Sequence, residues 1–147
     1  HVHRGYITDM TRMFSFGNPD NIWIERMEQM EEIAREVRNS LSRGDLCSDA
    51  WKIGHSISKN MGFSEHLMGM PPEQSRFLGH SIGLELDETP VVAAGFDVQL
   101  NHGSTMAIEP KVIFPEGAVG IEDCWVKSEN GIECLSSGST FPSWTQW

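Results

Sequence analysis

The sequence has no apolar run that approaches the roughly 20 residues a membrane-spanning helix needs, so we expect no membrane partner. It also lacks a basic segment followed by an apolar stretch at its start, so no signal peptide is visible. The chain begins with His1 rather than with methionine, so a segment upstream of it could have been processed or omitted.

Positive charge is scarce. The 147 residues contain 11 Lys and Arg against 21 Asp and Glu, which gives a formal net charge of -10. Such a surface would repel phosphates, so nucleic acid is excluded as an expected partner. An acidic excess either serves solubility or gathers carboxylates around cations.

Cysteine is also scarce, with Cys47, Cys124 and Cys134 as the three examples. They form no CxxC pair and no even set that would predict a disulfide framework. We therefore expect a reducing compartment and a cytoplasmic location, with each cysteine acting as a small core residue.

The first half of the chain shows one aromatic and β-branched segment followed by two helical patterns. Residues 5–16 predict a strand. Apolar residues at steps of three and four predict a helix over about 20–42, with Asp20 or Asn21 as its N-cap and Gly44 beyond its end. A second helix is expected over about 46–60, followed by a loop over 63–77.

The second half, residues 78–135, predicts short strands separated by Gly, Pro and Asn. The strongest hairpin signal is Asn130-Gly131, between strands expected at 119–127 and 132–135. The tail, 136–147, is polar, but Trp144 and Trp147 are expected to cover a core edge or a subunit contact, which leaves a homodimer open. The order of elements predicts a single α+β domain over 1–147 with an antiparallel sheet.

Four residues interrupt apolar segments: Asp9, His80, Glu109 and Glu122. Taken one at a time, each carboxylate could simply face solvent. Three carboxylates and an imidazole in one buried site would instead need a cation, because burial and like charges raise carboxylate pKa values. Oxygen ligands with one imidazole suit Mn, Fe, Co or Zn.

The segments around these residues resemble, in order, four motifs of the creatinase, prolidase and methionine aminopeptidase superfamily, the "pita-bread" metallopeptidases. Residues 79–86 are similar to its GHGIGLEL signature, and residues 6–12 resemble its Y-x-S-D-x-T-R segment. Residues 108–110 and 120–123 resemble its later IEP and G-x-(x)-E-D elements. The resemblance implies a curved antiparallel sheet with helices packed on its outer face, and it is nearest to Xaa-Pro dipeptidases and aminopeptidases.

The resemblance also implies a role for each matched residue. Asp9 and Glu122 would bridge two metal ions, and His80 would be the sole imidazole ligand of the first ion. Glu109 would bind that ion and shuttle the proton, while a hydroxide held between the metals attacks the scissile amide. Thr11 would support a ligating carboxylate from outside the ligand set.

The chain departs from the family pattern at two places. The family's first aspartate precedes the second by more residues than stand before Asp9, so residues 1–147 are read as an N-terminally incomplete catalytic domain. The second metal site would then be incomplete, and the activity of the chain by itself stays open. Asp87 stands where peptidases of the family usually have a histidine that contacts substrate.

An ionised Asp87 cannot donate a hydrogen bond to a peptide carbonyl, but it could accept one from a cationic substrate or act as a base. Variation within a peptidase subgroup is the simpler alternative. We therefore expect a metal-dependent hydrolase that acts on a small peptide through Glu109, His80 and Asp87. The alternatives are a creatinase-like or lyase-like relative with a small non-peptide substrate, and a binding module that kept the fold and lost catalysis.

Overall fold

The computed structural model describes residues 1–136 and, for their backbone, residues 144–146. Trp147 and the side chain of Trp144, which we expected at a core edge or subunit contact, lie outside that description.

Two helices follow one another near the positions predicted from the sequence. Helix α1 spans Asn21–Arg43 and helix α2 spans Cys47–Asn60. Gly44 ends α1 in the left-handed conformation, and its N–H lies 3.1 Å from the Leu41 carbonyl oxygen. Asp20 is the N-cap residue, which confirms the first of the two predicted positions, although its side chain makes no capping hydrogen bond.

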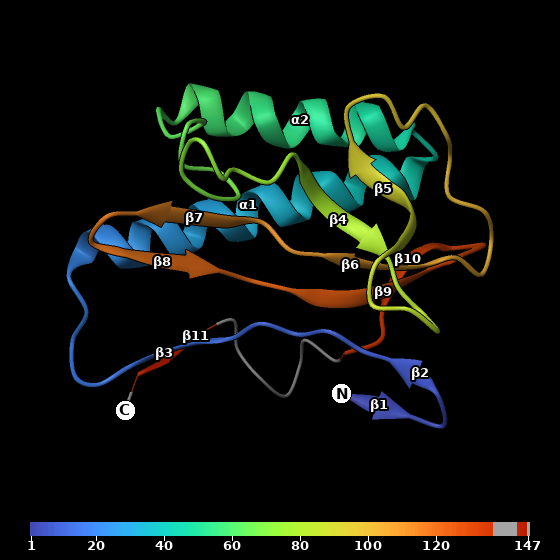
Figure 1. The fold of residues 1–147 in the computed structure, drawn as a ribbon, viewed down its shortest axis with the longest axis horizontal. Helices are drawn as coiled ribbons and strands as arrows, with labels where there is room; N and C mark the ends of the chain where they lie inside the picture. The colour runs from blue at the N-terminus through green and yellow to red at the C-terminus, as the bar shows by residue number, and fades with distance from the viewer. Residues whose placement is uncertain (137–143, 147) are drawn as a thin grey trace.

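The strands form one main sheet and three small pairs. The five-stranded sheet has the order β10-β9-β6-β4-β5, and all its neighbours are antiparallel (Figure 1). The strands are β1 Val2–His3, β2 Tyr6–Ile7, β3 Met13–Ser15, β4 Phe77–Ser81, β5 Glu88–Ala93, β6 Thr105–Ile108, β7 Lys111–Phe114, β8 Gly117–Gly120, β9 Asp123–Ser128, β10 Gly131–Cys134 and β11 Trp144–Gln146.

The single strand expected over 5–16 is divided into β2 and β3. Between them, the Asp9 amide bonds to the Cys124 thiol and the Thr11 hydroxyl bonds to Glu122. The backbones of Thr11 and Glu122 form an isolated bridge and not a continuous ladder. The strand expected over 119–127 is also divided. Its first part, β8, pairs with β7, whereas β9 pairs with β6. Glu122 lies at the break between them.

The hairpin predicted around Asn130-Gly131 is present, but its turn lies one residue earlier, because Gly131 already pairs with Ser128. The tail contributes more structure than its polar composition indicated. Its residues 144–146 form β11, which pairs in parallel with β3.

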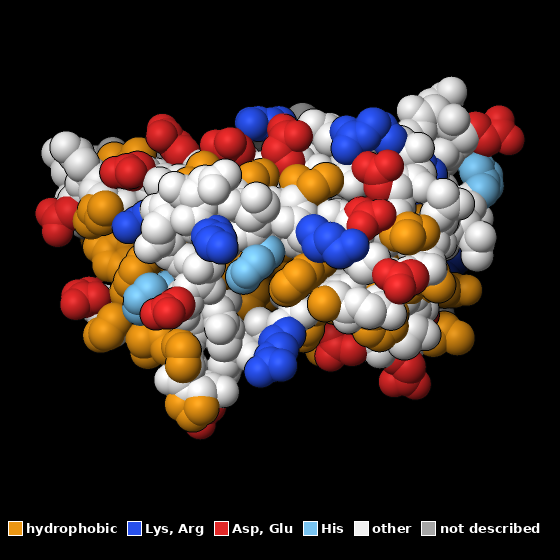
Figure 2. All heavy atoms as spheres, turned by 90° about the horizontal axis from the view of Figure 1, so that it is seen from above, with side chains coloured by type: hydrophobic (Ala, Val, Ile, Leu, Met, Phe, Trp, Pro, Cys, Tyr) orange, Lys and Arg blue, Asp and Glu red, His pale blue; other side chains and the backbone are white. Residues whose placement is uncertain are grey.

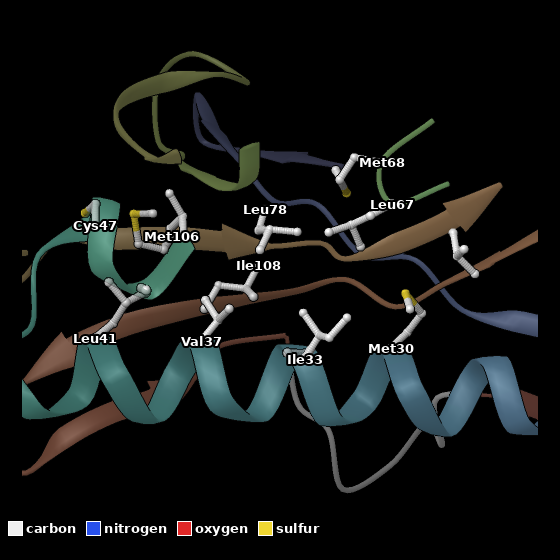
Figure 3. Close-up of a cluster of buried hydrophobic side chains, with 14 of the residues drawn as sticks. Met30, Ile33, Val37, Leu41, Cys47, Leu67, Met68, Leu78, Met106 and Ile108 are labelled. Carbon is white, nitrogen blue, oxygen red and sulfur yellow. The ribbon is translucent and has the colours of Figure 1, made fainter. Parts of the chain in front are cut away.

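The core lies between the helices and the main sheet. Met30, Ile33, Val37 and Leu41 of α1 point toward Leu78 and Ile108 of the sheet (Figure 3). All six of these side chains are at most 1% exposed, and burying each stabilises the fold by about 1.5–3 kcal/mol. The expected arrangement, with helices on one face of an antiparallel sheet, is confirmed (Figure 1).

The outer surface carries mixed charge. Over the face on which α2 lies, acidic and basic side chains are interspersed (Figure 2). Within the part of the chain that the structure describes, neither helix has the length and apolar character required to cross a bilayer.

Candidate metal centre

His80 is placed by the close pairing of β4 with β6. Gly79 precedes it, and a Cβ at Gly79 would collide with the Ala107 carbonyl oxygen, so glycine is required there. His80 pairs with Ala107 in the ladder and its side chain is 3% exposed. The main sheet therefore fixes the imidazole in a buried position.

The two ring nitrogens of His80 have different partners. Nδ1 lies 3.0 Å from the Ser81 carbonyl oxygen and donates to it, so Nε2 is the nitrogen that faces the site. Nε2 lies 3.3 Å from a carboxylate oxygen of Asp87 and 3.3 Å from one of Glu109. Burial alone would lower the pKa of His80, but Glu109, the Ser81 carbonyl and Asp87 together raise it to about 9.

Asp9 and Glu122 lie beside the same imidazole, although one comes from the start of the chain and the other from its last third. One donor atom from each of Asp9, His80 and Glu122 lies within 4.8 Å of the other two. Burial raises the pKa of Glu122, and the charges of Glu109 and Asp9 raise it further, whereas the Thr11 hydroxyl opposes this by donating over 2.7 Å. The contact expected of Thr11 is present.

Glu109 follows β6 directly and is 7% exposed. One of its carboxylate oxygens faces His80, and the other forms an ion pair with the Lys111 ammonium. Burial raises the pKa of Glu109, but the hydrogen bonds and charges of His80 and Lys111 outweigh burial and lower it. Glu109 is therefore held as a carboxylate beside the cluster of Asp9, His80 and Glu122.

Asp87 reaches the site from the loop between β4 and β5. The loop is tightened where Glu88 accepts a hydrogen bond from the Glu85 amide over 2.9 Å. The Asp87 side chain is 68% exposed, although its carboxylate touches the buried His80. Asp87 therefore lies on the solvent side of the imidazole.

The donor set fits a divalent cation. Four carboxylates around one imidazole nitrogen repel one another unless positive charge lies among them. A metal ion bound at Nε2 would supply that charge, and the bond from Nδ1 to the Ser81 carbonyl fixes the tautomer that leaves Nε2 free to ligate. Carboxylate oxygens with an imidazole suit a divalent transition metal.

Three consecutive residues attach residues 9–12 to the main sheet. Glu122 accepts the Thr11 hydroxyl, Asp123 pairs with the Arg12 guanidinium at 2.7 Å, and the Cys124 thiol contacts the backbone of Asp9. We call residues 122–124 the anchoring segment. It compensates for the absence of ladder pairing in this stretch and brings Asp9 to His80.

Some residues at this site were not predicted from the sequence. Lys111 had a usable signal, because it stands two residues after Glu109 across Pro110, a spacing that returns a side chain to the same face of an extended segment. Cys124 had no such signal, because its partner Asp9 is more than 100 residues away in the chain. Arg12 and Asp123 each end a matched motif, but the motifs did not indicate that the two side chains pair.

Comparison with known proteins identifies the family of the chain. Residues 1–129 match the model of metallopeptidase family M24. The chain belongs to this family. It is 30% identical to an Xaa-Pro dipeptidase of Lactobacillus delbrueckii subsp. lactis, over 90% of this chain and 34% of that protein.

Solved structures of family M24 relatives give the same fold. The prolidase of Pyrococcus horikoshii is 28% identical, with a TM-score of 0.80 over 90% of this chain and 37% of that one. An X-Pro aminopeptidase of Thermotoga maritima, 23% identical, aligns with a TM-score of 0.85 over 97% of this chain and 38% of that one. The α+β pita-bread fold is thereby confirmed, and the chain spans a little over a third of the length of these relatives.

Proposed function

We propose that the protein is a divalent-metal-dependent hydrolase of the Xaa-Pro dipeptidase or aminopeptidase type that acts on small peptides. The observation that carries this proposal is the buried Nε2 of His80, which faces carboxylates of Asp87 and Glu109 at 3.3 Å. The names of the family M24 relatives support the substrate class. The three free cysteines support a cytoplasmic location.

We assign Asp9, His80, Glu109 and Glu122 as the metal ligands. Asp9 and Glu122 would be shared between two ions of Mn, Co, Zn or Fe, and His80 and Glu109 would belong to the first. Among the residues that the structure describes, Asp9 and Glu122 are the ligands we assign to the second ion.

Bound divalent ions would polarise the scissile amide carbonyl and make water a stronger nucleophile at neutral pH. Glu109 would accept the proton of the attacking water at the oxygen that faces His80, then pass it to the leaving amine nitrogen. Lys111, paired with the other oxygen, keeps Glu109 ionised and ready to accept that proton. His80, Glu109 and Glu122 are themselves buried, so few water molecules can contact these three side chains.

Asp87 would contact the substrate. Its carboxylate is exposed and adjoins His80, so it can accept a hydrogen bond from an N–H or ammonium group of a molecule bound at the centre. The same carboxylate favours one alternative, a small cationic substrate that is not a peptide. In both cases Asp87 selects the substrate, and metal binding depends on the other four residues.

The test is hydrolysis of Xaa-Pro dipeptides by the intact protein loaded with Mn²⁺, Co²⁺ or Zn²⁺. The Glu109→Gln variant should lose at least about 10²-fold in kcat, because the amide cannot take the proton. Glu129→Gln, at an exposed carboxylate away from the centre, is the matched control and should keep the wild-type rate. Wild-type activity in Glu109→Gln, or no hydrolysis with any of these metals, would contradict the proposal.

A further inference from the structure

Asp9 is the candidate ligand with the least support from regular structure. It lies between the two-residue strand β2 and the three-residue strand β3, and it is partly exposed. His80, by contrast, lies within the main sheet. A loop carboxylate is held more precisely at a metal centre when specific contacts fix its own backbone.

Cys124 supplies such contacts with a single sulfur atom. The Asp9 N–H donates to Cys124 Sγ over 3.2 Å, and the Cys124 thiol donates to the Asp9 carbonyl oxygen, also over 3.2 Å. A thiol can do both, because it is a weak donor and a weak acceptor. The pair satisfies both backbone polar groups of Asp9.

The thiol is itself rigidly placed. Cys124 belongs to β9, pairs with Ala107 of β6, and is 2% exposed. Its own N–H donates to the Ser136 hydroxyl over 2.9 Å. Of the three residues of the anchoring segment, Cys124 is the one that binds the backbone of the candidate ligand, whereas Glu122 and Asp123 bind the neighbouring Thr11 and Arg12.

We propose that Cys124 is a positioning residue, which holds the Asp9 carboxylate at the metal centre by its paired hydrogen bonds to the Asp9 backbone. This inference rests on the proposed function, since it takes Asp9 as a ligand. A serine hydroxyl could replace both contacts, whereas alanine could replace neither.

The test compares Mn²⁺ affinity, measured by equilibrium titration, in wild type, Cys124→Ala and Cys124→Ser. Cys124→Ala should weaken binding by about 10–100-fold, as when other supporting groups of metal ligands are removed. Cys124→Ser should restore affinity to within about threefold of wild type, because it keeps the donor and the acceptor. Cys47→Ala, at a buried cysteine in the first turn of α2, is the matched control for a general packing effect and should bind normally.

Amide hydrogen exchange provides a readout without metal. The Asp9 amide should be protected in wild type and in Cys124→Ser, and it should exchange at least about tenfold faster in Cys124→Ala. An unprotected Asp9 amide in wild type would overturn the inference even if Cys124→Ala failed to fold. Equal metal affinity in Cys124→Ala and wild type would also overturn it, whereas a wild type that binds none of Mn²⁺, Co²⁺ and Zn²⁺ would refute the proposed function instead.

Discussion

His80 Nδ1 lies 3.0 Å from the carbonyl oxygen of Ser81, so the imidazole donates its Nδ1 proton to the backbone of the next residue. The other nitrogen then faces carboxylates of Asp87 and Glu109. Without a metal ion, a second proton on the ring is the cation that these carboxylates favour. A proton and a metal ion therefore compete for the same atom.

Metal binding should release a proton near neutral pH. The pKa of His80 is raised to about 9 in the metal-free fold, so at pH 7.5 Nε2 is protonated and must lose its proton to ligate. Calorimetric titration with Mn²⁺ in buffers of different ionisation enthalpy should give about one proton released per His80. Affinity should rise with pH up to about 9, and pH-independent affinity would contradict the assignment of His80.

The same raised pKa predicts how the metal-free protein responds to pH. The folded state holds the His80 proton more tightly than the unfolded chain does, so this contribution to stability is complete below about pH 6.5 and is lost as pH rises through about 9. Urea unfolding of metal-free protein should show this fall, and His80→Gln should remove it. A His55→Gln variant, changed at a histidine that stacks on Trp51, is the control and should keep the fall.

Asp87→His should alter the choice of substrate and leave metal content unchanged. If the substrate is a peptide, the new imidazole can donate to its carbonyl, and gaining such a donor is worth about 10²–10³ in rate. If the substrate is cationic and not a peptide, the same change should abolish that activity. Rates on both substrate classes, with metal content measured alongside, separate these outcomes; loss of metal would show that Asp87 is misassigned.

Lys111→Met should move the acid limb of the pH–rate profile to higher pH. Lys111 is one of the groups that lower the pKa of Glu109, and without it the burial of that carboxyl raises its pKa. The measurement is kcat/KM against pH on an Xaa-Pro dipeptide. Lys111→Arg should keep the wild-type profile, and so should Lys52→Met, which removes an exposed pairing with Asp49 on α2.

Arg12→Ala should destabilise the fold by about 3–5 kcal/mol, because it leaves the Asp123 carboxylate buried without its cation. The side chains of this pair are 8% and 9% exposed. Arg43→Ala removes a guanidinium from the pair with Asp45, whose side chains are 59% and 38% exposed, and should cost much less. Chemical denaturation of the three proteins tests this difference, and equal losses for the two variants would refute it.

The helices and the order of elements could be predicted because their signals are local. The apolar spacing along α1 and the glycine at its end are properties of neighbouring residues. Together they predicted the first and last residues of α1 to within a residue or two of those in the structure. The strands were less predictable. Whether residues 8–12 or 121–122 join a ladder depends on partners far away in the chain, so two expected strands were divided.

The candidate centre was predictable from motifs, and its support was not. The resemblance gave Asp9, His80, Glu109 and Glu122, and the structure brings three of them into one cluster with Glu109 against His80. The thiol of Cys124 gave no hint of its contact with Asp9, because a buried cysteine is ordinarily a small core residue. The contact of Cys124 with Asp9 lies outside the matched motifs and spans more than 100 residues, so it needed the fold.

The central claim is that His80 and the carboxylates around it hold a divalent metal ion, and metal content measures this most directly. The intact protein should be equilibrated with Mn²⁺, Co²⁺ or Zn²⁺, dialysed, and analysed by elemental analysis beside His80→Ala and the control His55→Ala. We expect bound metal in wild type and His55→Ala, and loss of first-site occupancy in His80→Ala. Metal content in His80→Ala equal to that of wild type would contradict the account.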